Sequence, residues 1–234
     1  MTRDFDRHGP GRLHGVAVMR EDRIEKAQSM KLYYASGTSS IGIRLLLEEI
    51  GLPFEDEHVD FSKRQQYEQS YIAINPKSKV PALLRDDGSV LTEFPVIAQW
   101  LARAFPAAHL LPDGLDRQTR VLESLEYMVA TVHMQGFTRI FRPEYFNPDP
   151  AAADDVKAQG RQVVEKGFSF LEQAVEGPYL HGDFSIADAA LFYLEHWVVA
   201  RLGDPLPPRL DAHYRTMTGR PAVMQAITGD RRPH

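Results

Sequence analysis

A valine–proline step at the entry to an apolar strand constrains this chain more than any other feature. Residues 75–84 read Asn-Pro-Lys-Ser-Lys-Val-Pro-Ala-Leu-Leu, which places Pro81 directly before the strand pattern. Proline gives no hydrogen bond to a sheet and favours strand starts, and an X–Pro bond can be cis. A bent or cis bond at this step would turn the Val80 backbone away from its own sheet and leave it free to pair with another backbone.

A tight turn and a helix start follow this step. Residues 86–89, Asp-Asp-Gly-Ser, form the turn of a predicted hairpin, and Glu93 comes at the mouth of the next predicted helix. Free N–H groups and the helix dipole attract carboxylates at such a place. Together with the free Val80 backbone, this helix mouth predicts a pocket for a small peptide.

Strand and helix patterns alternate from residue 31 to residue 104. The helix predicted first has its apolar residues on one face and ends at Gly51 and Pro53. This alternation predicts a thioredoxin-like β-α-β-α-β-β-α unit. Its strands are expected at 32–34, 54–59, 82–84 and 90–91, and its helices at 39–50, 64–72 and 94–104.

The rest of the chain is predicted to be all helical, so the fold class is α/β followed by all-α. Turn formers at 105–114 mark a connection, and about five helices without any further strand are expected beyond it. The sequence thus predicts four parts: a poorly ordered extension at 1–29, a thioredoxin-like domain at 30–106, a linker at 107–115 and a helical bundle at 116–234.

Composition limits the partners of this chain. Its 234 residues are 43% hydrophobic and carry a formal net charge of -5, with no basic run and no apolar run of membrane-spanning length. We therefore expect a cytoplasmic protein that binds neither nucleic acid nor a membrane.

The absence of cysteine limits the chemistry further. A thioredoxin-like unit that does redox work carries two cysteines at the turn into its first helix, and here the same spacing holds Ser36 and Ser39. The chain can form no disulfide and no thiolate metal site, and no metal is expected. In any thiol chemistry, the sulfur must arrive with the ligand.

Several segments together resemble the glutathione S-transferases, most closely the bacterial beta-like class. Besides 75–84, they are 31–41, 47–54, 133–137 and 184–189, in the family's order and spacing. The resemblance implies the glutathione S-transferase fold, glutathione as cosubstrate, transfer of its sulfur to a small hydrophobic electrophile, a role in detoxification and a homodimer. Within the last segment, Ser185 and Asp188 have the spacing of a helix capping box.

Activation of glutathione means stabilising its thiolate. Lowering a thiol pKa from about 8.5 by about 2 units takes roughly 2.7 kcal/mol, which one or two hydrogen bonds to the charged sulfur, each worth about 1.5–3 kcal/mol, can supply. Ser39, at the start of the first helix, is the candidate donor, and Tyr34 is the alternative. Beta-class enzymes have a cysteine where this chain has Ser39. The structural alternatives are a helix cap for Ser39 and strand packing for Tyr34.

The resemblance also implies residues that bind glutathione. The bond before Pro81 is expected to be cis, and the backbone of Val80 to pair with the cysteinyl part. Glu93 and the backbone N–H of Phe94 are expected to hold the γ-glutamyl end, although the family commonly has serine in place of Phe94. Without the resemblance, Glu93 is a favourable carboxylate at a helix start.

Two further residues are candidates for the same ligand. The resemblance implies that His133, on the helical part, helps to bind glutathione across the cleft, and that Arg64 meets the glycine carboxylate. The alternatives are a packing histidine and a solvated charge. Candidates for the wall of the electrophile pocket, or else for the core, are Phe137, Phe141, Tyr145 and Phe146.

Fold alone leaves other functions open. A glutathione-dependent isomerase, dehalogenase or ether lyase would use the same fold and thiolate. A non-catalytic interaction module would keep the fold without the chemistry.

Overall fold

The computed structural model describes residues 30–230, so the predicted extension at 1–29 lies outside the described residues. The N-terminal part is a four-stranded sheet in the order β2-β1-β3-β4, in which β1 and β2 are parallel and the other neighbours antiparallel. This arrangement confirms the thioredoxin-like unit. Its elements are β1 (Lys31–Tyr34), α2 (Ser40–Ile50), β2 (Glu55–His58), α3 (Gln69–Ile72), β3 (Ala82–Leu84), β4 (Val90–Thr92) and α4 (Phe94–Ala104).

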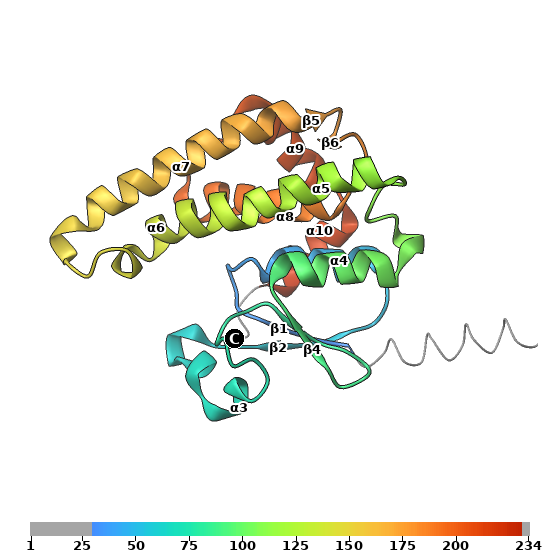
Figure 1. Ribbon diagram of the computed structural model, residues 1–234, viewed down its shortest axis with the longest axis horizontal. Coiled ribbons are helices and arrows are strands. Elements are labelled where there is room, and N and C mark those ends of the chain that lie inside the picture. Colours follow the sequence, from blue (N-terminus) through green and yellow to red (C-terminus); the bar gives the residue numbers. More distant parts are fainter. Residues whose placement is uncertain (1–29, 231–234) are drawn as a thin grey trace, which may run out of the picture.

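Side chains of β1 alternate between the two faces of the sheet, as in any strand. Tyr33 packs on Tyr71 of α3, with ring centres 5.9 Å apart. Tyr34 points the other way, with its ring centre 4.6 Å from the guanidinium carbon of Arg44 in α2. Figure 1 shows the same division, with α3 on one side of the sheet and α4 between the sheet and the helical part.

The helix predicted over 64–72 is wrong in its first half. Arg64 has a left-handed backbone, with φ of 60°, and separates two 3₁₀ turns, η1 (Phe61–Lys63) and η2 (Gln65–Tyr67). A non-glycine residue in this conformation does not continue an α-helix. The helix α3 therefore keeps only residues 69–72.

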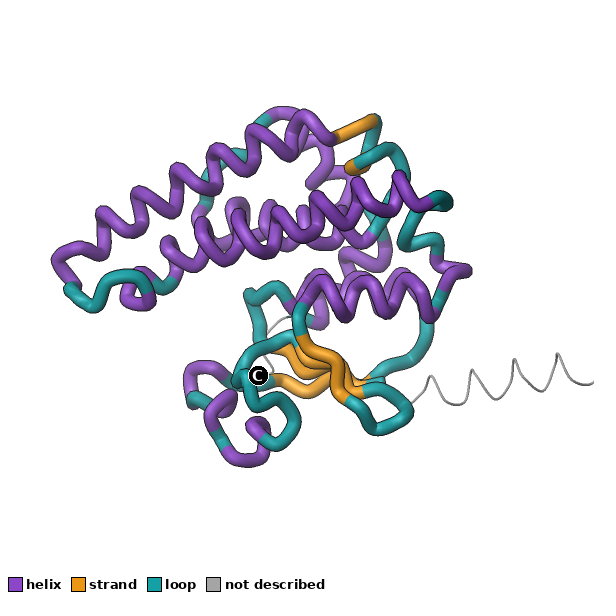
Figure 2. Tube along the Cα trace, in the orientation of Figure 1, coloured by secondary structure: helices purple, strands orange, loops and turns teal. Residues whose placement is uncertain are grey.

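The second part is helical, as predicted, and Figure 2 shows its helices above the small sheet. One continuous rod consists of α5 (Leu115–Tyr127), the π-helical segment η4 (Met128–Phe137) and α6 (Thr138–Phe141). The other helices are α7 (Ala153–Ala174), α8 (Ile186–Trp197) with its π-helical continuation η7 (Val198–Leu202), α9 (Pro208–Thr218) and α10 (Pro221–Gly229). Short 3₁₀ turns lie at η3 (Pro106–Ala108), η5 (Pro143–Tyr145) and η6 (Pro150–Ala152).

The expectation of no further strand is wrong. The strands β5 (Val175–Glu176) and β6 (Tyr179–Leu180) form a small antiparallel hairpin after α7. Gly177, with φ of 68°, supplies its turn. Two residues are too few to show the alternation by which strands are recognised in a sequence.

Helix α8 lies at the centre of the molecule, and each of its residues except His196 is buried. Helix α2 crosses α8 closely, because a Cβ at Gly42 would lie 2.8 Å from the carbonyl oxygen of Ala189. One hydrophobic cluster runs from β1 to α10. The predicted boundaries at 30–106, 107–115 and 116–234 therefore stay a prediction.

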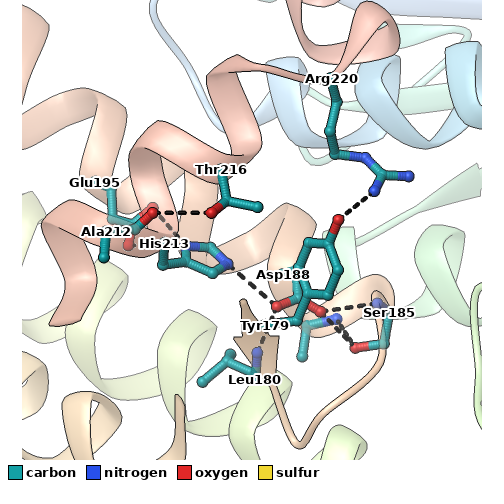
Figure 3. A network of polar contacts seen from close by, with 10 residues as sticks. Tyr179, Leu180, Ser185, Asp188, Glu195, Ala212, His213, Thr216 and Arg220 are labelled. Atoms are coloured by element: carbon teal, nitrogen blue, oxygen red, sulfur yellow. Dashed lines mark hydrogen bonds and ion pairs between the residues drawn. The ribbon is translucent and has the colours of Figure 1, made fainter. Parts of the chain in front are cut away.

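A buried ionic network joins α8 to α9 (Figure 3). Nδ1 of His213 lies 2.9 Å from both carboxylate oxygens of Glu195, and Nε2 lies 3.1 Å from Oδ1 of Asp188. Burial lowers the pKa of His213, but the two facing carboxylates outweigh it and raise that pKa to about 9. His213 is therefore charged at neutral pH and lies between Asp188 and Glu195. Burial raises the pKa of Glu195 to about 7, although the charge of His213 opposes this shift.

Asp188 also holds the start of α8. Its carboxylate accepts the N–H groups of Leu180 at 2.7 Å and Ser185 at 2.8 Å, and the Ser185 hydroxyl accepts the N–H of Ala187 at 3.2 Å. These bonds confirm the predicted capping box of Ser185 and Asp188.

Residues 30–230 contain neither a membrane-spanning helix nor a group of side chains suited to a metal ion. None of the helices there combines the length and the apolar character needed to cross a bilayer. No group of three or more His, Cys, Asp or Glu side chains in that range is placed to hold a metal ion.

Candidate functional site

The loop between β1 and α2 carries Ser39 to the N-terminus of α2. Ser39 is the N-cap residue, but its side chain makes no capping bond. Thr38 takes that role, since its Oγ1 accepts the N–H of Ser40 at 3.3 Å. Within residues 30–230, the Ser39 hydroxyl forms no hydrogen bond, so it is available to donate to a ligand.

Tyr34, the alternative donor, lies in a different environment. Its ring packs under Arg44 on the second turn of α2 and lies 5.3 Å from the ring of His58. Burial raises the pKa of the Tyr34 hydroxyl, and the carboxylate of Asp56 adds to the effect. These contacts place the tyrosine against the helix body, away from the free N–H groups at the helix start.

The peptide bond between Val80 and Pro81 is cis, as predicted. Val80 precedes β3, and among residues 30–230 its N–H and C=O form no backbone hydrogen bond. The loop is nevertheless held, because the Lys79 carbonyl accepts from Tyr71 Oη at 2.6 Å and from Asn75 Nδ2 at 2.7 Å. A fixed loop thus presents the free Val80 backbone.

Glu93 is the N-cap of α4 and has φ of 69°. Non-glycine residues with positive φ concentrate at functional sites. Its carboxylate accepts from Lys77 Nζ at 2.7 Å and stays 54% exposed. The neighbouring Phe94 is buried, with its ring 5.1 Å from that of Tyr193 in α8. Phe94 can therefore offer a ligand only its backbone N–H.

His133 lies in the π-helical segment η4 and packs against α8. Its Nδ1 is 3.2 Å from Tyr193 Oη, and its ring centre is 4.8 Å from that of Trp197. Burial, and to a smaller extent the charge of Lys79 in the cis-proline loop, lower the pKa of His133 to about 4. The imidazole is therefore neutral at physiological pH. Segments of π-helix are rare and often occur at functional sites.

Three residues fix the loop before Ser39, and nothing in the sequence pointed to them. The Gly37 carbonyl accepts from Trp197 Nε1 at 3.1 Å and from Arg201 Nη1 at 3.0 Å. The Gly37 N–H donates to Asp230 Oδ2 at 2.8 Å. The helical part thus holds the Ser39 loop from both sides.

Family models match both parts of the chain. The model for the N-terminal domain of glutathione S-transferases matches residues 39–104, and the model for their C-terminal domain matches residues 154–216. The chain belongs to the glutathione S-transferase family. The resemblance and the glutathione S-transferase fold expected from the sequence are confirmed.

Relatives of this glutathione S-transferase family member include the glutathione S-transferase GstA of Escherichia coli O157:H7. The two are 34% identical over 206 residues, which cover 86% of this chain and 98% of GstA. A maleylpyruvate isomerase from Ralstonia sp is 31% identical over 164 residues, covering 68% of this chain and 74% of that protein.

Two solved glutathione-bound structures are similar to this chain. A glutathione transferase homologue from Sulfitobacter superposes with a TM-score of 0.80 at 28% identity, covering 86% of this chain and 98% of that one. A sphingomonad glutathione S-transferase gives a TM-score of 0.74 at 31% identity with the same coverage.

Arg64 and some of the aromatic candidates do not contact the other predicted site residues. The Arg64 guanidinium lies 5.2 Å from the ring centre of Tyr67, and within residues 30–230 its side chain has no hydrogen bond or ion pair to the other candidates. Phe137 is fully buried and belongs to the core, while Tyr145 is 68% exposed. Phe141 is half-buried, and its ring is stacked on that of Phe137 with the ring centres 5.8 Å apart.

A cavity of about 580 Å³ lies elsewhere in this transferase-family chain. It opens between α7, η7 and the loop at 204–207, and an ion pair of Arg161 and Asp204 at 2.7 Å lies at its edge. None of the residues proposed for the site lines this cavity.

Proposed function

We propose that this protein is a glutathione transferase that joins the sulfur of glutathione to a small hydrophobic electrophile. The free Ser39 hydroxyl at the start of α2 carries the proposal. Similar structures with bound glutathione support glutathione as the cosubstrate.

In this proposal, glutathione lies along the cis-proline loop. Its cysteinyl part pairs with the free N–H and C=O of Val80, next to Pro81. Its γ-glutamyl end is held by the exposed carboxylate of Glu93 and the N–H of Phe94. Lys77 forms an ion pair with the same carboxylate. His133 helps from the helical part, and Arg64 is proposed to meet the glycine carboxylate.

Ser39 then donates its hydroxyl hydrogen to the sulfur. The positive end of the α2 dipole adds to the stabilisation of the thiolate. The two effects need to supply roughly 2.7 kcal/mol to lower the thiol pKa by about 2 units. Tyr34 is the alternative donor, although its ring packs against the second turn of α2.

Calorimetry with glutathione tests the proposal. We expect a dissociation constant between micromolar and millimolar, and about tenfold to a hundredfold weaker binding in Glu93→Ala, because a hydrogen bond to a charged group is worth about 1.5–3 kcal/mol. Arg103→Ala, on the same helix, is the matched control. Conjugation of a chlorodinitrobenzene should accompany binding. A wild-type protein that binds no glutathione would instead support the non-catalytic interaction module.

A second candidate is a glutathione-dependent isomerase, favoured by the similarity to the Ralstonia maleylpyruvate isomerase. Isomerisation returns glutathione unchanged, whereas conjugation consumes it. Incubation with maleylpyruvate, followed by measurement of free thiol, separates the two. A dehalogenase or an ether lyase would be recognised by released halide or phenol.

The remaining proposals concern assembly and location. Because the chain resembles a family whose members are usually dimers, we propose a homodimer, to be tested by light scattering after size exclusion. The cytosol keeps glutathione reduced, so we propose a cytoplasmic location and a role in detoxification.

A further inference from the structure

Arg201 lies where the helical part meets the Ser39 loop. It belongs to the π-helical segment η7, and its Nη1 donates to the Gly37 carbonyl at 3.0 Å. Its guanidinium carbon lies only 3.6 Å from the ring centre of Phe141 and 5.9 Å from that of Trp197. The guanidinium therefore lies on the Phe141 ring and is bonded to Gly37, which is two residues before Ser39 in the chain.

This guanidinium has no carboxylate partner among residues 30–230. Arg142, which follows Phe141, has none there either. Asp230 lies at Gly37 too, but its Oδ2 accepts the Gly37 N–H, and it forms no ion pair with Arg201. Burial lowers the pKa of Arg201, and the nearby Arg142 lowers it further. Two cations thus lie together, one of them partly desolvated.

Both arginines are exposed, so an anion from solvent can reach this pair of cations. A guanidinium has five N–H donors in a planar fork that matches a carboxylate, and a single bond to Gly37 uses one of them. The guanidinium is planar and one of its faces lies on Phe141, so its other face can stack on a flat, conjugated ligand. Lys79 of the cis-proline loop, whose charge acts on His133, is another exposed cation without an ion pair among residues 30–230.

We propose that Arg201, supported by Arg142, binds an anionic group on the electrophile, so that this enzyme prefers flat electrophiles that carry a carboxylate. The inference rests on the proposed function, since it names the substrate class of the same site. Arg201 is a binding and specificity residue in this scheme, and Ser39 still serves the sulfur.

A chlorodinitrobenzoate is a suitable probe reaction. The glutathione sulfur forms a bond to the ring carbon that carries chlorine, the electron pair of the carbon–chlorine bond leaves with chloride, and the thiol proton goes to solvent. Nothing is oxidised or reduced. The carboxylate takes no part in the bond changes, so its only expected role is binding to Arg201.

The experiment compares the chlorodinitrobenzoate with the carboxamide of the same ring. In the wild type, we expect kcat/KM to be about tenfold higher for the acid, and the preference to shrink with added salt. In Arg201→Gln, the preference should disappear, and Arg201→Lys should restore part of it. Arg139→Gln is the matched control, because Arg139 also lies over an aromatic ring, 4.0 Å from that of Phe146, but does not contact the Gly37 loop.

A different result is expected if Arg201 only anchors the Gly37 loop and binds no ligand. Loss of the bond to Gly37 alone would lower the rates with the acid and the amide by the same factor and leave their ratio unchanged. A wild type without preference for the acid, or an Arg201→Gln variant that keeps it, would overturn the proposal.

Direct binding separates this proposal from the proposed function. Dinitrobenzoate and dinitrobenzamide lack the chlorine and cannot react, so calorimetry with each reports the anion site without catalysis. We expect the acid to bind about tenfold more tightly in the wild type and equally in Arg201→Gln. Failure of glutathione to bind would remove the proposed function, whereas equal binding of acid and amide would remove the anion site.

Discussion

Two polar clusters of this molecule differ in how completely the protein satisfies them. In the network of Asp188, Glu195 and His213, both ring nitrogens of the histidine and both oxygens of Asp188 have partners. Around the Ser39 loop, the Ser39 hydroxyl has none among residues 30–230, and buried polar atoms of Ser36, Arg44 and Asp230 have none there either.

The difference separates structure from function. Buried polar groups are nearly always paired, so a complete network is what folding alone requires. Polar groups without partners next to a helix N-terminus have no such explanation and suit a ligand. Charge and burial alone would not have made this distinction, since both clusters contain buried titratable groups.

Breaking the complete network should have the largest effect. Asp188→Ala removes the capping acceptor of α8 and leaves His213 with one carboxylate, so we expect a loss of about 3–5 kcal/mol of stability. For a chain of this size, Tm should fall by roughly 6–20 °C. Urea and thermal unfolding measure both values.

The matched change at the loop is Ser39→Ala. Because this hydroxyl has no partner to lose among residues 30–230, its removal should alter stability by less than about 0.5 kcal/mol. Equal destabilisation by the two substitutions would contradict the distinction between the clusters.

The network should also make stability depend on pH. The folded-state pKa of His213 is raised to about 9 from 6.5, so its contribution is fully present below pH 6.5 and lost as pH rises through 9. The loss should reach about 3 kcal/mol. His213→Gln should flatten the unfolding free energy across this range, and an unchanged slope would show that the histidine is not held between the carboxylates.

At the loop, the expected effect is on catalysis. Ser39→Ala should lower the conjugation rate at neutral pH about tenfold to a hundredfold, because one bond to the thiolate worth about 1.5–3 kcal/mol is lost. The pKa of bound glutathione should rise in parallel. Tyr34→Phe is the comparison, and a larger drop in that variant would reverse the two roles.

A smaller effect is expected at Asp230, which holds the Gly37 N–H. Burial raises the pKa of Asp230 to about 6. Its carboxyl therefore gains a proton as pH falls through about 6, which weakens the bond to Gly37, and activity should fall with it. Asp230→Asn replaces a charged acceptor by a neutral one and should cost about 1 kcal/mol, or about fivefold in rate. In this variant, activity should no longer fall as the pH drops through about 6. A fall that persists in Asp230→Asn would be due to the titration of another group.

Local patterns were enough to predict much of the fold. The strand at 82–84 and the helix at 94–104 end where the spacing predicted, and the proline step together with the family resemblance predicted the cis bond. The site residues Ser39, Val80 and Glu93 could be proposed because each belongs to a short contiguous motif.

The remaining features depend on contacts between distant residues. Gly37 bonds to Trp197 and Asp230, which lie 160 and 193 residues away, and no periodicity reports such pairs. Trp197 and Arg201 end an apolar helix, where a sequence pattern indicates only core and surface. His213 is a single histidine in a polar stretch, and only the fold brings two carboxylates to it.

Ser39→Cys tests most directly whether this position faces the sulfur of glutathione. The helix N-terminus favours a thiolate, so the variant should form a mixed disulfide with oxidised glutathione. Mass spectrometry should find one glutathione per chain in Ser39→Cys and none in the wild type, which has no cysteine. Ser36→Cys, three residues earlier with its side-chain oxygen buried, should stay unmodified. A Ser39→Cys thiol that remains free and inert to alkylating agents would contradict the site.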